Sequence, residues 1–160
     1  MDMKEITEQQ ALFKLSALCS QAEHCSGEML DKMRRWGINE AVQARIMARL
    51  TAEKYVDDER YTRAFARDKI RYNGWGRRKL EQALYAKHIE RAVYIPVLDE
   101  IADHEYLDVL RPLLRNKQKS IKAHSDYERN MKLIKFAMGR GFDYSLIRQC
   151  LEGDFDEPME

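Results

Sequence analysis

Four arginines at helical spacing are the residues of this chain best suited to bind a charged partner. They are Arg60, Arg63, Arg67 and Arg71. On a helix they fall within an arc of about 80°, since each residue turns the chain by roughly 100°. Guanidinium groups on one face form charge-assisted hydrogen bonds with phosphates or carboxylates. The sequence therefore predicts a binding surface here, with aromatic residues on a separate arc of the same helix.

Further basic residues extend this surface into a second helix and form another cluster later in the chain. The other residues predicted to contact a partner or DNA are Arg77, Arg78, Lys79, Lys87, Arg115, Lys117, Lys119, Lys122, Arg129 and Lys132. Cations at a helix start oppose its dipole, which disfavours a purely local role for those at 77–79. The alternative interpretation is that the cations only keep helix faces solvated. It is stronger for the later cluster, because Lys-rich helix ends are common.

Trp75 stands between Gly74 and Gly76 and has two interpretations. Its ring either fills the gap between two helices or stays exposed, where it would stack on a nucleic-acid base. We favour packing, but both interpretations remain open. The Gly-Trp-Gly segment is too short to form a phosphate-cradling glycine loop.

No arrangement of side chains typical of an enzyme or a metal site occurs in the sequence. The four histidines are scattered, and no nucleophile with its base or pair of carboxylates has useful spacing. The three cysteines, Cys19, Cys25 and Cys150, include no C-x-x-C pair, which is typical of reduced thiols in an intracellular protein. We therefore expect no catalysis, no metal and no cofactor.

The net charge of +1 conceals a strong segregation of charge. Residues 60–91 hold ten Lys and Arg against three Asp and Glu, and residues 111–135 hold eight against two. Such blocks attract polyanions even when the whole molecule is nearly neutral. An apolar content of 44% indicates a folded protein, and no apolar run suits a membrane span or a secretory signal. We expect a cytoplasmic monomer.

Helical signals run along the whole chain. Asp57 can cap a helix whose first turn carries Asp58 and Glu59, and Ser125 with Glu128 predicts a capping box. The expected helices are 7–20, 26–36, 39–53, 57–73, 77–87, 90–102, 104–122, 125–139 and 143–151. Alternating runs typical of strands are absent, so we expect an all-α protein.

A unit of about fifty residues is repeated three times. Gly37-Ile38, His88-Ile89 and Gly141-Phe142 recur at spacings of 51 and 53 residues. Aligning them brings two sets of apolar residues into register, which are Met29, Leu80 and Leu133, and Met33, Leu84 and Ala137. We predict three-helix repeats at 1–54, 55–103 and 104–152 and a frayed acidic tail at 153–160. Stacked repeats predict an elongated, slightly curved, solenoid-like body.

The segment 56–89 resembles the RecX family of recombinase regulators. The matching residues are Asp57, Asp58, Arg60, Tyr61, Gly74, Trp75, Gly76, Leu80, Leu84, Lys87 and Ile89. Arg77 stands where the family usually has proline. His88 stands where it has a helix-ending glycine, and must adopt a left-handed backbone at a cost of about 1 kcal/mol.

The resemblance implies a regulator that binds the RecA filament on single-stranded DNA and inhibits its strand-exchange, ATP-hydrolysis and co-protease activities. Nothing in composition or periodicity identifies RecA itself. The alternative is a helical protein that binds nucleic acid directly, without a recombinase. A third class, a structural scaffold, would need an exposed apolar groove, which the sequence does not reveal.

Overall fold

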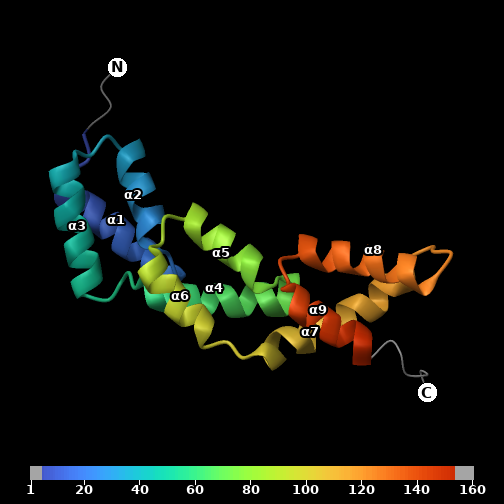
Figure 1. Ribbon diagram of the computed structural model, residues 1–160. Helices are drawn as coiled ribbons and strands as arrows, with labels where there is room; N and C mark the ends of the chain where they lie inside the picture. The colour runs from blue at the N-terminus through green and yellow to red at the C-terminus, as the bar shows by residue number, and fades with distance from the viewer. Residues whose placement is uncertain (1–4, 154–160) are drawn as a thin grey trace. The chain divides into compact units, whose positions relative to one another are not determined.

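The computed structural model describes residues 5–153, and every regular element among them is an α-helix. These helices are α1 Glu8–Gln21, α2 Ser26–Arg35, α3 Glu40–Ala52, α4 Asp58–Asn73, α5 Arg77–Ala86, α6 Arg91–Asp99, α7 Asp103–Gln118, α8 Asp126–Gly139 and α9 Tyr144–Gly153 (Figure 1). The all-α prediction is confirmed. The expected boundaries hold within two residues, except that α6 and α7 end three and four residues earlier than expected. The predicted tail, apart from Gly153, lies outside the described residues.

Side-chain caps begin several helices where the sequence places them. The Asn39 side chain accepts a hydrogen bond from the Val42 amide at 3.0 Å, and Asp57 accepts one from the Arg60 amide at 3.0 Å. Ser125 accepts from the Glu128 amide at 3.1 Å, as a capping box requires. The Glu128 carboxylate, however, accepts from the His124 amide at 3.1 Å, one residue before the position predicted for the return bond.

Contacts divide the chain into two compact units. The first holds residues up to Arg63 together with Leu84–Tyr94, and the second holds Ala64–Ala83 together with residues from Ile95 onward. In the first unit α3 packs against both α1 and α2, around a buried cluster that includes Leu15, Met33 and Ile46. In the second unit α7, α8 and α9 pack against one another (Figure 1).

The three aligned turns share one backbone geometry. Gly37, His88 and Gly141 have φ angles of 74°, 64° and 93°. The amide of the next residue then donates to the carbonyl five positions earlier, a bond that closes the end of a helix. These bonds are Ile38 to Met33 at 3.0 Å, Ile89 to Leu84 at 3.2 Å and Phe142 to Ala137 at 3.2 Å. The left-handed conformation predicted for His88 is confirmed.

Each residue that the repeat alignment brings into register is buried. Met29, Leu80, Leu133, Met33, Leu84 and Ala137 are all 0% exposed. The second helix of each predicted repeat, α2, α5 or α8, therefore buries side chains at equivalent positions. Each of the predicted ranges 1–54 and 55–103 holds three helices, and α7 to α9 occupy Asp103–Gly153. That these ranges are separate domains remains a prediction.

In each unit, close backbone contacts join the end of one helix to the start of another, and both are second helices of predicted repeats. In the first unit a Cβ added to Gly27 in α2 would lie 2.1 Å from the Lys87 carbonyl oxygen, just past α5. In the second, the Gly76 amide donates to the Arg140 carbonyl at 2.9 Å and the Arg78 amide donates to the Gly141 carbonyl at 3.0 Å. Carbonyls left unpaired at the end of α8 thus accept from amides left unpaired at the start of α5.

Candidate partner-binding surface

Helix α4 carries the predicted arginine stripe, and its start is held by two aspartates. Asp57 caps α4 itself, whereas Asp58 accepts hydrogen bonds from the amide and the hydroxyl of Ser26, the amide at 2.8 Å. Asp58 therefore fixes the start of α4 to the start of α2. No sequence pattern predicted this contact, because Asp58 fits a helix start without any tertiary partner.

The first two arginines of the stripe have acidic partners within the chain. Arg60 Nε donates to Glu23 at 2.7 Å, and Arg60 Nη2 reaches the carbonyl of Lys54 at 3.2 Å. Arg63 Nη2 pairs with Glu59 at 2.9 Å, one helical turn earlier. Both arginine side chains are partly exposed, at 41% and 38%. Their charges are thus partly compensated before any partner binds.

The last two arginines of the stripe, Arg67 and Arg71, are exposed and form no ion pair with the described residues 5–153. They line a pocket of about 340 Å³, which we call the α4–α7 pocket. Its other lining residues are Ile70, Ile101, Glu105, Asp108 and Val109. Two guanidinium groups on α4 and two carboxylates on α7 therefore line the same pocket, together with aliphatic side chains.

Trp75 is partly buried and has two ammonium groups close to its ring. Its ring meets the edge of Phe65 with centroids 6.1 Å apart and an interplanar angle of 71°. Lys69 Nζ lies 5.1 Å from the Trp75 ring and Lys79 Nζ lies 5.0 Å from it. The ring therefore packs in the second unit while keeping two cations beside it. Lys69 was not among the predicted site residues. The sequence signal that could have indicated it is its position on the helix that precedes the Gly-Trp-Gly segment.

The three cations at the start of α5 have different surroundings. Arg77 pairs with Glu81 at 2.8 Å and with Asp99 at 2.7 Å, so it ties α5 to the end of α6. Partial burial disfavours its charge, but the hydrogen bonds to Glu81 and Asp99 outweigh this effect and raise the Arg77 pKa. Arg78 is exposed, and Lys79 is partly buried beside Trp75.

The later basic cluster is spread over α7, α8 and the loop between them. Arg129 pairs with Asp126 at 3.2 Å, and Lys132 pairs with Glu128 at 3.3 Å. Lys117 Nζ lies 5.1 Å from the Phe136 ring. The remaining predicted cations here, Arg115, Lys119 and Lys122, are exposed. Lys132 Nζ also donates to the Lys122 carbonyl at 2.7 Å, which joins α8 to the loop before it.

Lys87 and Arg140 are basic residues with contacts that sequence spacing did not reveal. Lys87 Nζ lies 5.8 Å from the ring of Tyr61, a residue that is 8% exposed. Arg140, absent from the predicted set, lies 5.2 Å from the Phe136 ring and donates to the Asn73 carbonyl at 2.8 Å. Both side chains therefore take part in packing within their own units.

The titratable groups elsewhere in the described part of the chain include a buried thiol and a buried phenol. Within residues 5–153, no three His, Cys, Asp or Glu side chains gather closely enough to hold a metal ion. Burial raises the pKa of the Cys25 thiol to about 11. Burial also raises the pKa of Tyr106, whose hydroxyl has no hydrogen-bond partner among residues 5–153. No helix of the described chain is long and apolar enough to cross a membrane.

Two family models match this chain. They are RecX, second three-helix domain, over residues 57–93, and RecX, third three-helix domain, over residues 104–151. Together they cover just over half of the chain. The curated regulatory proteins RecX of Bacillus mycoides (strain KBAB4) and Bacillus cereus (strain AH820) are each 23% identical over 130 residues. These matches cover 81% of this chain and 48% of each relative, so the chain spans about half their length.

Two solved structures have a similar fold. The crystal structure of RecX from Lactobacillus salivarius has a TM-score of 0.86 at 17% identity, covering 93% of this chain and 96% of that one. A crystal structure of regulatory protein RecX has a TM-score of 0.82 at 16% identity, and the match covers 91% of this chain and 73% of that one. At such low identity the likeness establishes the fold alone.

Proposed function

Because this chain belongs to the RecX family of regulatory proteins, we propose that it binds a RecA filament on single-stranded DNA and inhibits it. Inhibition would extend to the recombinase, ATPase and co-protease activities. The DNA in such a filament is a long polyanion. The physical requirement on this chain is a surface of cations that its own acids do not neutralise.

The observation that carries the proposal concerns Arg67 and Arg71. Both side chains are exposed, and neither forms an ion pair with any of residues 5–153. The two side chains are four residues apart on α4, so they lie on the same face one turn apart. Guanidinium groups there keep their full capacity for charge-assisted hydrogen bonds. Arg60 and Arg77, by contrast, already hold acids at 2.7 Å, and we assign them mainly to structural support.

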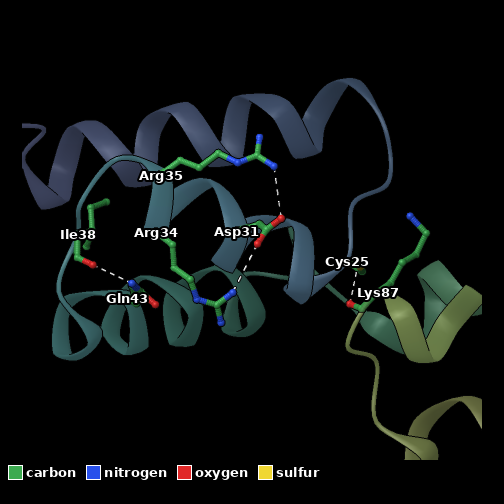
Figure 2. Close-up of polar contacts among 7 residues, drawn as sticks. All are labelled: Cys25, Asp31, Arg34, Arg35, Ile38, Gln43 and Lys87. Carbon is green, nitrogen blue, oxygen red and sulfur yellow. Dashed lines mark hydrogen bonds and ion pairs between the residues drawn. The ribbon is translucent and has the colours of Figure 1, made fainter.

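The test compares two double variants that remove the same charge. R67A/R71A removes the uncompensated arginines, and R34A/R35A removes two arginines that are 57% and 75% exposed on α2. Arg34 and Arg35 both pair with Asp31 at 3.5 Å (Figure 2). RecA ATP hydrolysis on single-stranded DNA is measured with increasing amounts of each variant. Circular dichroism and thermal unfolding establish that each is folded.

We expect R67A/R71A to require about tenfold more protein or greater for half-inhibition, corresponding to ~1.4 kcal/mol or more of lost binding free energy. R34A/R35A should inhibit within about twofold of wild type. Full inhibition by folded R67A/R71A would refute the proposed role of α4. An equal loss in both variants would mean that inhibition responds to net charge alone.

A second candidate function is direct binding of single-stranded nucleic acid, and the surroundings of Trp75 favour it. The partly buried indole lies 5.1 Å from the Lys69 ammonium and 5.0 Å from the Lys79 ammonium. Aromatic rings stack on bases while nearby cations contact phosphates. Titration with single-stranded DNA at two salt concentrations tests this candidate, because phosphate contacts make affinity fall steeply with salt. Weak DNA binding beside tight filament binding would favour the regulator.

A further inference from the structure

We propose that the α4–α7 pocket receives a protein segment and not a nucleic-acid strand. The segment would present an acidic side chain to α4, an aliphatic side chain to the middle of the pocket and a basic side chain to α7. This inference rests on the proposed function, and it specifies that Arg67 and Arg71 contact the protein part of the filament.

The basic wall and the acidic wall of the pocket are not neutralised by each other. No ion pair joins Arg67 or Arg71 to Glu105 or Asp108, all within the described chain. Both walls therefore keep charge that a ligand can meet. The two arginines lie one turn apart on α4, which is the spacing at which both can reach one carboxylate.

The acidic wall on α7 is also available to a ligand. Asp108 is 74% exposed, and its ion-pair neighbour is His104 at 3.8 Å, an attraction that exists only when the histidine is protonated. Glu105 uses Oε2 to accept a hydrogen bond from the Ala102 amide at 3.1 Å at the start of α7. Its carboxylate still adds negative charge to the pocket. A basic side chain is the natural complement of this wall.

Aliphatic side chains line the pocket together with the two charged walls. Ile70 is 6% exposed, while Ile101 and Val109 remain partly exposed where they line the pocket. A volume of about 340 Å³ can take a bulky apolar side chain together with flanking polar groups. Burying that side chain would exclude water and strengthen the charge contacts on both sides.

Electrostatics distinguish a protein from a nucleic acid at this site. A single strand carries one negative charge per nucleotide and no positive group. Phosphates drawn to Arg67 and Arg71 would lie in the same pocket as the carboxylates of Glu105 and Asp108. Like charges in one partly enclosed space repel, whereas a protein segment supplies both signs in the required order.

Charge reversal on the acidic wall provides the test. D108K reverses the exposed acid of the pocket, and D108N only removes its charge. D68K is the matched control, because Asp68 is an exposed acid on α4 next to Arg67 but does not line the pocket. Each variant is titrated against RecA filaments on single-stranded DNA and, separately, against single-stranded DNA alone. Circular dichroism verifies the fold of each.

We expect D108K to bind the filament at least tenfold more weakly, D108N to lose less, and D68K to stay within twofold of wild type. Binding of D108K to DNA alone should be unchanged or tighter, since a negative charge has become positive. Filament binding by D108K at or above the wild-type level would overturn the inference, as would equal losses in D108K and D68K. Retained inhibition by R67A/R71A would instead overturn the proposed function, so the two failures are distinguishable.

Discussion

Replacing Gly76 by alanine tests the contact between the start of α5 and the end of α8. A Cβ on Gly76 would lie 2.4 Å from the Phe142 amide nitrogen and 2.5 Å from the Gly141 carbonyl group. These neighbours are backbone atoms, so they cannot rotate away as a flexible side chain would. Gly76 does not have a positive φ angle, and the substitution therefore adds steric conflict without local backbone strain.

The cost of this substitution follows from the bonds that must open. Separating the two helix ends would break or lengthen the Gly76–Arg140 and Arg78–Gly141 hydrogen bonds, at 2.9 and 3.0 Å. Each is worth about 1 kcal/mol, and overpacking a close contact costs about 1–3 kcal/mol. We expect the free energy of unfolding to fall by about 2–4 kcal/mol. For a chain of this size that lowers Tm by about 5–15 °C.

Thermal unfolding followed by circular dichroism measures this effect, with G139A as the control. Gly139 is the last residue of α8, and a Cβ there would meet no atom within 4 Å. Alanine favours a helix over glycine by about 0.5–1 kcal/mol, so G139A should leave Tm unchanged or raise it slightly. A G76A protein with the wild-type Tm would show that the α5–α8 contact does not exist in solution.

Two further predictions concern buried and paired groups. R77A should lower the free energy of unfolding by about 1–2 kcal/mol, because it leaves Glu81 and Asp99 without their shared cation. R78A, the control, should change this free energy by less than about 0.5 kcal/mol. Urea unfolding compares the two variants, and equal stabilities would contradict the role assigned to Arg77. The Cys25 thiol, with its pKa raised to about 11, should react with a thiol reagent at pH 8 more slowly than the partly exposed Cys19. Timed labelling followed by mass spectrometry tests this order, and faster labelling of Cys25 would show that its site opens in the native state.

The helices and their turns could be predicted because their causes are local. Asn39 and Asp57 cap helices through amides three residues away. A glycine or histidine marks the left-handed turn of each repeat, although the left-handed Lys54 was not predicted. The early ends of α6 and α7 were missed because helical periodicity does not show where tertiary packing stops supporting a helix.

The candidate site was only partly predictable. Helical spacing placed the four arginines on α4, but it could not show that Arg60 pairs with Glu23, which is 37 residues away in sequence. Nor could it show that Arg77 pairs with Asp99. Lys69 and Arg140 were overlooked although each lies four residues after its aromatic neighbour, Phe65 or Phe136, a spacing that places both side chains on one helix face.

The sequence alone determined that this chain is helical, that it carries a repeated turn, and that cations gather on α4. Periodicity and backbone conformation act over a few residues, so one segment contains all the information they need. Only the tertiary structure decided which cations have no acid paired with them and can pair with a partner instead. That depends on which acids lie nearby in the folded chain. Arg67 and Arg71 lack an ion pair among residues 5–153, whereas Arg60 and Arg77 have close acidic partners.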